Sequence, residues 1–202
     1  MKFAAKVMIA LGAALVFITS MMEAGHAADL SRPVTLVATT RLAGSLYEET
    51  VLVATPLPGG QHVGFILNRP TRVKLETLFP GHAPSREVAD PVSLGGPMYP
   101  AMIVAVTRKA PPGGGPTIAL MPGLVAVMDA DSVDRVIEKT PNDARYFAGL
   151  VIWAQGELDQ EIRGGAWNAR PANVEIVFSA RPAGLWKELS GGAPWFEARL
   201  ER

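Results

Sequence analysis

Short runs of β-branched and aliphatic residues recur along the chain from Val34 onward, separated by glycine, proline or polar residues. Runs of this length and composition predict β-strands. The predicted strands are Val34–Thr39, Thr50–Thr55, His62–Leu67, Met102–Thr107, Thr117–Met121, Ala148–Trp153 and Asn173–Phe178. The Leu-Pro-Gly-Gly turn at 57–60 predicts that the second and third strands form a hairpin.

A proline- and glycine-rich segment, Pro111–Pro116, separates two of the predicted strands. A glycine-rich loop can hold phosphate when a helix follows it, and in the P-loop a Lys-Ser/Thr pair begins that helix. Here Pro116 and a strand follow. The segment therefore predicts the flexible tip of a hairpin and no nucleotide site.

Four segments have apolar residues at helical spacing. The predicted helices are Lys74–Phe79, Ala130–Lys139, Gly156–Arg163 and Gly184–Leu189. In the first of them Leu75, Leu78 and Phe79 fall on one face, and Thr71 is placed to cap its start. Strands outnumber helices and are mostly linked as hairpins, which predicts an α+β fold with a largely antiparallel sheet.

The first 27 residues have the pattern of a bacterial signal peptide. Lys2 and Lys6 form a positive start, Val7–Ile18 is an uncharged apolar run, and small residues precede a cleavage position after Ala27. The apolar run is short for a bilayer span of about 20 residues, although an uncleaved inner-membrane anchor is the alternative. We expect a signal peptide at 1–27, one domain at 28–202, and a periplasmic or secreted location.

Composition limits the chemistry of that domain. The chain has no cysteine, which excludes disulfides, thiolate nucleophiles and cysteine-bound zinc. Residues 1–27 hold two lysines and one glutamate, so the remainder carries 17 basic and 18 acidic residues. This balance argues against nucleic acid as a partner, because phosphate binding usually needs a basic face. We expect a membrane contact only through an uncleaved leader.

The residue types used for catalysis show no familiar arrangement. His62 and His82 each lie beside a turn, with no carboxylate or second histidine at metal-ligand spacing, and we interpret both as solvated turn residues. No Gly-x-Ser-x-Gly or Ser-x-x-Lys motif is present. Glu157, Asp159 and Glu161 suit the positive end of a helix dipole. We therefore predict no catalytic residue, no metal and no cofactor.

Two polar turns nevertheless stand out. Asn68 and Arg69, followed by Pro70 and Thr71, end a buried-looking strand with an amide and a guanidinium. These groups either fasten the strand end or bind a carboxylate or phosphate. Gly95 and Gly96 allow either a tight crossing of two backbones or the approach of a ligand to bare amides.

A third segment, Phe147–Leu158, runs from a strand through Trp153 into a helix start. Free backbone N–H groups at this helix start could hold an anion. Alternatively, Trp153 packs in the core and its indole finds a backbone acceptor. Trp167 and Trp186 are interpreted as core or rim aromatics.

In this order, these segments resemble the AlgH/YqgE family of bacterial proteins. The matching residues are Gly64 with Leu67–Thr71, Leu94–Pro97, then Gly149, Trp153, Gly156 and Leu158, and finally Gly165–Trp167. The resemblance covers roughly residues 34–190. This chain departs from the family pattern in its bulky residues between Gly149 and Trp153, in Glu157, where a neutral amide is usual, and in its leader.

The resemblance implies a compact α+β fold, with a bent sheet forming a pseudo-barrel and short helices around it. It implies no established reaction, and family members are described as uncharacterised or as suggested transcriptional regulators. We therefore predict a non-enzymatic binding or accessory protein of the cell envelope, contacting a peptide or a small polar ligand. The alternatives are a regulator of the family type or a hydrolase using Glu157.

The candidate surface combines the three segments. Arg69 would bind an anionic group, and backbone N–H groups would donate at Gly95, Gly96 and Gly156. Trp153 would form a wall. The candidate ligand-binding residues are Asn68, Arg69, Thr71, Gly95, Gly96, Trp153, Gly156 and Glu157.

Overall fold

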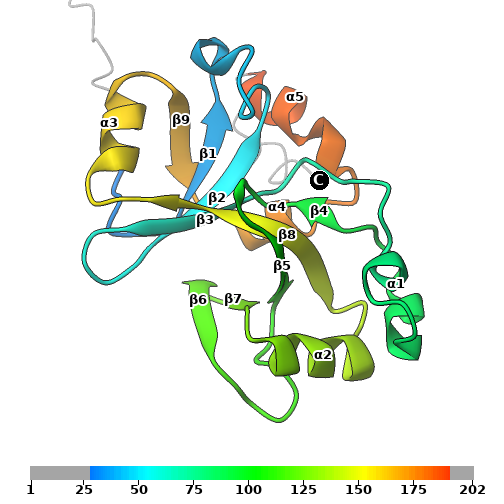
Figure 1. The fold of residues 1–202 in the computed structure, drawn as a ribbon. Helices are drawn as coiled ribbons and strands as arrows, with labels where there is room; N and C mark the ends of the chain where they lie inside the picture. Colours follow the sequence, from blue (N-terminus) through cyan, green and yellow to red (C-terminus); the bar gives the residue numbers. More distant parts are fainter. Residues whose placement is uncertain (1–27, 192–202) are drawn as a thin grey trace, which may run out of the picture.

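The computed structural model describes residues 28–191, which form a bent sheet with short helices around it (Figure 1). The predicted leader lies outside the described residues. Nine strands pair in the order β6-β7-β5-β8-β3-β2-β1-β9 within the described part, and β4 pairs with β8. The strands are β1 (Val34–Ala38), β2 (Val51–Pro56), β3 (His62–Ile66), β4 (Ser93–Leu94), β5 (Met98–Thr107), β6 (Thr117–Met121), β7 (Leu124–Val127), β8 (Ala144–Trp153) and β9 (Trp167–Pro171).

The helices are short and lie around the sheet. They are α1 (Leu75–Leu78), α2 (Ala130–Lys139), α3 (Glu157–Arg163), α4 (Val174–Val177) and α5 (Leu185–Ser190), with 3₁₀ turns η1 (Thr40–Leu42), η2 (Ala83–Glu87) and η3 (Pro182–Gly184). Figure 1 shows α3 at one end of the sheet and α1 with α2 at the other. Within residues 28–191, no helix has the length and apolar character of a membrane span.

Strand β8 holds the two halves of the sheet together. Its last residues, Val151–Trp153, pair antiparallel with β3, and its first residues, Ala144–Ala148, pair antiparallel with β5. The short β4 runs parallel to β8 at Phe147. The other strand pairs are antiparallel, which confirms the predicted fold class.

The sheet curls around one core and carries two more on its outer face. The inner core joins residues such as Phe65, Val104 and Leu150 with Ile176 of α4 and Leu189 of α5. On the outer face, α3 covers the β1–β3 region through Leu158, and α2 covers β5 and the start of β8 through Val133, Val136 and Ile137. Burial of these apolar faces supplies the main driving force for this arrangement.

The sequence predicted most of these elements. Six predicted strands lie in β1, β2, β3, β5, β6 and β8, and the predicted helices coincide with α1, α2, α3 and α5 to within about two residues. The β2–β3 hairpin is confirmed, with the Leu57 N–H donating to the Gln61 carbonyl. The sequence analysis did not predict β4, β7 or β9.

The predicted strand Asn173–Phe178 is wrong. This segment forms α4, whose first turn is capped by the Asn173 side chain accepting from the Glu175 N–H at 2.8 Å. One turn of helix is enough to bury Ile176 and Val177 together. A short apolar run fits the spacing of a strand and of a helix equally well. Here the Asn173 cap and the burial of Ile176 and Val177 favour the helix.

The predicted hairpin across Pro111–Pro116 is also wrong, because β7 lies between β5 and β6. A turn at Gly123, with a positive φ of 77°, folds β7 back onto β6. The Pro111–Pro116 loop instead lies on α2. Arg135 donates there to the carbonyls of Pro112 and Gly114, at 3.0 and 2.9 Å.

The predicted packing of α1 needs two corrections. Leu75 is fully buried, but Leu78 and Phe79 are 42% and 36% exposed, because α1 is a single turn at the edge of the fold. Thr71 does not cap this helix, since Lys74 is the N-cap residue and makes no side-chain cap bond. The Thr71 hydroxyl instead donates to the Val92 carbonyl at 2.6 Å.

Candidate functional site

Asn68 follows the end of β3 and fastens it to the start of β2. Its side chain is 3% exposed; its Oδ1 accepts from the Val51 N–H and its Nδ2 donates to the Glu49 carbonyl, both at 2.8 Å. A buried amide that bonds two backbone groups stabilises the strand end, above all because the buried Val51 N–H would otherwise lack a partner. This geometry matches the fastening alternative.

Arg69 and Thr71 continue this connection toward the segment before β4. The Arg69 guanidinium donates to the Glu48 carbonyl, and the Arg69 carbonyl accepts from the Leu94 N–H at 2.9 Å. Thr71 bonds Val92 through both its hydroxyl and its backbone N–H. The two polar turns therefore lie side by side, as the sequence analysis expected.

Gly95 and Gly96 cross β8 at Gly149 with almost no space between the backbones. The Gly95 N–H donates to the Ala148 carbonyl, and the Gly95 carbonyl accepts from the Ile66 N–H, both at 2.8 Å. A Cβ on Gly95 would lie 2.2 Å from the Gly149 oxygen, and one on Gly96 would lie 2.3 Å from the Leu150 oxygen. The paired glycines thus serve a crossing of two backbones.

Trp153 lies in a different part of the fold, under α3. Its indole N–H donates to Glu161 Oε2 at 2.9 Å, and the indole of Trp167 donates to the same oxygen at 2.7 Å. Both tryptophans are 3% exposed. Trp153 therefore packs in the core as one alternative expected, although its acceptor is a carboxylate and not a backbone carbonyl.

Tyr47 completes this aromatic cluster. Its ring meets the Trp167 ring edge-on, with centroids 5.6 Å apart. Burial, and secondarily the negative charges of Glu161 and Glu157, raise the pKa of Tyr47 above its ordinary value. The tyrosine therefore stays protonated at neutral pH.

Replacing Glu161 with glutamine tests the value of this shared carboxylate. We expect Glu161→Gln to lower the free energy of unfolding by about 1–2 kcal/mol, because two hydrogen bonds lose the charge of their acceptor. Urea unfolding followed by tryptophan emission measures the change. An unchanged midpoint with an unchanged emission maximum would contradict a stabilising role for the charge.

Gly156 and Glu157 form the start of α3. Gly156 is the N-cap residue, with φ of 79°, and the Glu157 carboxylate accepts from the Ala154 N–H at 2.7 Å. The exposed Glu157 side chain therefore occupies the helix end that was considered for an anion. This contact favours a capping role for Glu157 over acid–base catalysis.

The structure brings together only part of the predicted site. Asn68, Arg69 and Thr71 meet Gly95 and Gly96, as described above. Trp153 pairs with His62 at the other end of β3, six residues before Asn68, which is roughly 20 Å along an extended strand. The binding role of the eight candidates stays a prediction, but their polar groups mostly bond within the protein.

A surface that the sequence analysis missed lies directly after Gly96. Between Met98 and Ile103 the register of β5 against β8 shifts, since Met98 pairs with Leu150 and Ile103 with Ala148. The residues between them bulge outward. Pro97–Ala101, which we call the apolar bulge, consists of exposed residues, with Tyr99 60% and Met98 43% exposed.

Backbone strain accompanies this exposure. Tyr99 has φ of 51°, in the left-handed region that costs a non-glycine residue roughly 1–2 kcal/mol. Bulky aromatic residues are uncommon in this region, and strained residues gather at functional sites. Tyr99 thus combines high exposure, apolar surface and an unfavourable backbone.

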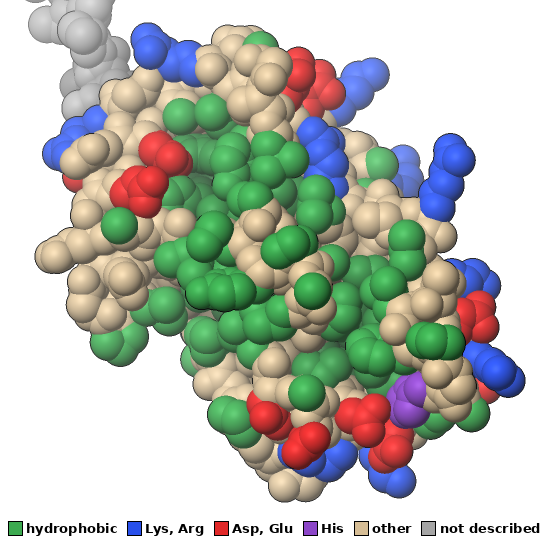
Figure 2. Space-filling view, viewed as in Figure 1, with side chains coloured by type: hydrophobic (Ala, Val, Ile, Leu, Met, Phe, Trp, Pro, Cys, Tyr) green, Lys and Arg blue, Asp and Glu red, His purple; other side chains and the backbone are tan. Residues whose placement is uncertain are grey.

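The apolar bulge borders a cleft of about 220 Å³ against α2. The cleft is lined by Phe79, Ala101, Met102, Ile103, Met128, Ala130, Val133, Asp134 and Ile137. Figure 2 shows hydrophobic side chains gathered across the middle of this face, with charged side chains mostly toward the rim. An exposed apolar area with a polar rim is typical of a protein-interaction surface.

The histidines differ from the sequence interpretation. His62 is 7% exposed, and its Nε2 lies 3.0 Å from the Leu30 carbonyl, so it is a buried residue and not a solvated one. His82 is half-buried, and its Nε2 lies 3.1 Å from Asp134 Oδ1. Asp134 is 52 positions further along the chain, which explains why local spacing did not reveal it.

Comparison with known proteins gives one family. A family model described as AlgH-like matches residues 35–193. A UPF0301 protein of Thermobifida fusca is 30% identical over 165 residues, which covers 76% of this chain and 82% of that protein. Another UPF0301 protein, from Chlorobium limicola, is 27% identical over 154 residues, covering 75% and 80%.

Two solved structures share the fold. The solution structure of the AlgH protein from Pseudomonas aeruginosa matches with a TM-score of 0.65 and 17% identity, covering 86% of this chain and 94% of that one. A crystal structure of a Corynebacterium diphtheriae protein matches with a TM-score of 0.63 and 22% identity, covering 82% and 88%. At these identities the likeness concerns the fold alone.

Proposed function

We propose that this chain, which belongs to the AlgH-like family, is a non-enzymatic binding protein of the cell envelope whose partner is a peptide segment of another protein. The observation that carries the proposal is the apolar bulge Pro97–Ala101, exposed throughout and strained at Tyr99. The envelope location rests on the charged start and the apolar run of residues 1–27.

The chemistry of this surface favours a peptide over the small polar ligand that was the other expectation. From Pro91 to Thr107 the chain carries no charged residue. The exposed part of this run offers prolines, a methionine and a tyrosine, which suit an apolar, uncharged segment. The adjoining cleft gives room for one or two apolar side chains of that segment.

The two alternative functions find less support in the geometry. The Glu157 carboxylate, on which the hydrolase depends, bonds the Ala154 N–H at the start of α3. A regulator that binds nucleic acid needs a basic face, and the described part of the chain supplies a nearly balanced charge. We therefore place the function at the apolar bulge.

Site-specific photo-crosslinking identifies the partner. A photoreactive phenylalanine analogue placed at position 99 in the exporting cell should crosslink one partner protein, and the same analogue at position 49 should not. Mass spectrometry then names the crosslinked peptide. A product consisting of two copies of this chain would overturn the proposal and make the bulge a self-association surface.

Tyr99→Gly separates binding from stability. Glycine accepts the left-handed backbone but has a more flexible unfolded chain, so we expect the free energy of unfolding to change by less than about 1 kcal/mol. Removing the exposed ring should weaken the Kd for the crosslinked peptide at least tenfold, as for a central aromatic at an interface. Fluorescence titration with the synthetic peptide measures this change.

Glu49→Gly is the matched control. Glu49 also has φ of 51° and is exposed, but it lies outside the apolar bulge. The same relief of strain should leave peptide affinity unchanged. Equal affinity in Tyr99→Gly and the wild type would contradict the proposed surface, because the ring would then contribute nothing to the contact.

A further inference from the structure

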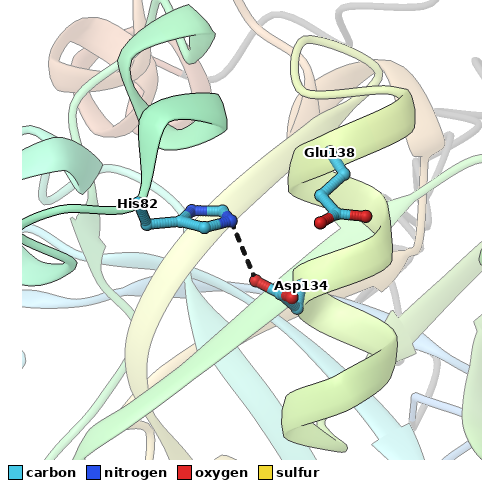
Figure 3. A group of neighbouring side chains, drawn as sticks. All are labelled: His82, Asp134 and Glu138. Atoms are coloured by element: carbon cyan, nitrogen blue, oxygen red, sulfur yellow. Dashed lines mark ion pairs between the residues drawn. The ribbon is translucent and has the colours of Figure 1, made fainter.

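Three side chains from two distant segments converge beside the apolar cleft. His82 lies between α1 and η2, and Asp134 and Glu138 lie one turn apart on α2. One ligand atom from each residue lies within 4.8 Å of the others. Figure 3 shows the imidazole pointing at α2, with both carboxylates on the side of the helix that faces it.

The imidazole is held in place by its surroundings. The His82 N–H donates to the Phe79 carbonyl at 3.1 Å, and the His82 carbonyl accepts from both the N–H and the hydroxyl of Ser85. The Phe79 ring meets the imidazole edge-on at 6.5 Å. These contacts fix the backbone of the His82 turn, and the Phe79 ring packs beside the imidazole, so less freedom is lost when a ligand binds.

The ring nitrogens of His82 lack hydrogen-bond partners among residues 28–191, although both atoms are buried. Nε2 lies 3.1 Å from Asp134 Oδ1, close enough for an ion pair but without the angles of a hydrogen bond. Buried polar atoms nearly always have a hydrogen-bond partner. Two nitrogens of one imidazole without such a partner therefore need an explanation.

We propose that His82, Asp134 and Glu138 bind a divalent transition metal ion, with Zn²⁺ as the best fit. One imidazole nitrogen with two carboxylate oxygens suits Zn²⁺ or Mn²⁺, whereas Mg²⁺ and Ca²⁺ prefer oxygen ligands alone. Ligand atoms around Zn²⁺ lie about 2.0–2.2 Å from the ion. The exposed side chains of Asp134 and Glu138 can close the remaining distance by small torsions.

Such an ion would join the segment that follows α1 to α2. Three protein ligands leave one position of a tetrahedral ion for water or a partner group. Asp134 also lines the apolar cleft, so an ion held by it sits at the edge of that cleft. The metal site stands on its own contacts and does not depend on the apolar bulge being a docking surface.

Calorimetric titration of the metal-free full chain with Zn²⁺ tests the proposal. We expect one Zn²⁺ per chain, and a Kd weakened at least tenfold in each of His82→Gln, Asp134→Asn and Glu138→Gln, as for loss of a group that supports a metal. A Zn²⁺ concentration of about one hundred times the wild-type Kd should raise Tm by roughly 5–10 °C in the wild type, and by at most about half as much in these three variants.

Asp131→Asn is the matched control, because Asp131 is an exposed acid on the same helix outside the cluster. It should retain the wild-type affinity. Co²⁺ titration adds a direct readout, since four-coordinate Co²⁺ absorbs visible light much more strongly than hydrated Co²⁺, and His82→Gln should weaken this absorption. Wild-type Zn²⁺ affinity in all four variants, or no saturable binding by the wild type, would overturn the proposal. The cluster would then be only the ion pair of His82 and Asp134 beside a second carboxylate.

Discussion

Gly149→Ala is expected to lower the free energy of unfolding by about 2–5 kcal/mol. A residue with a side chain loses about 1–2 kcal/mol in the left-handed backbone that Gly149 adopts, with φ of 69°. The Cβ of the new alanine would also lie 2.5 Å from the Gly96 oxygen and 2.7 Å from the Met98 oxygen. Crowding of this kind costs a further 1–3 kcal/mol, roughly. Thermal unfolding should show a Tm lower by about 10 °C.

Gly123→Ala separates the two causes. Gly123 has a similar φ of 77°, but a Cβ there would meet nothing within 4 Å. The loss at Gly123 should therefore be about 1–2 kcal/mol, the cost of the backbone alone. Similar losses at both positions would show that the backbones at Gly149 can move apart, and that the crossing is less rigid than its contacts indicate.

Asn68→Ala should cost about 2–4 kcal/mol. The change removes the partner of the Val51 N–H and the partner of the Glu49 carbonyl, at a side chain that is 3% exposed. Each buried backbone group without a partner costs about 1–3 kcal/mol, and water can reach the partly exposed Glu49 carbonyl. Urea unfolding measures the loss, and amide hydrogen exchange should show faster exchange at Val51.

Arg69→Ala is the comparison from the neighbouring residue. The guanidinium donates to the Glu48 carbonyl at an exposed position, so its removal should cost less than about 1 kcal/mol. If Arg69→Ala destabilises as much as Asn68→Ala, the arginine is a structural residue. If Arg69→Ala leaves stability unchanged but weakens binding of a carboxylate or phosphate ligand, the sequence-predicted anion site is supported.

Much of the fold follows from local patterns in the sequence. The β2–β3 hairpin and α2 were predictable because turn residues, caps and apolar spacing agree within a few neighbouring residues. The helix at Asn173–Phe178 was not predictable, because a short apolar run of that length fits a strand as well as one helical turn. The helix forms because it buries Ile176 and Val177 in the inner core. The placement of β7 between β5 and β6 depends on long-range pairing that no local signal reports.

The candidate site was less predictable for the same reason. The glycine pair and the Asn68 turn were recognisable as unusual, but whether they face a ligand or another backbone depends on β8, about 50 residues later. Leu78 and Phe79 have the spacing of a buried face, yet α1 ends before that face reaches the core. His82 gained its acidic neighbours only through the docking of α2.

Strand β8 also determines when the sheet can finish folding. Its pairings with β3 and β5 span about 90 and 45 residues of chain, and β9 joins β1 across more than 100. Until residue 144 has emerged, the edges of β3 and β5 that β8 will occupy stay open, and topologies with such distant contacts fold slowly. A polypeptide that completes its sheet this late stays unfolded for longer, and this delay would favour the export that we propose.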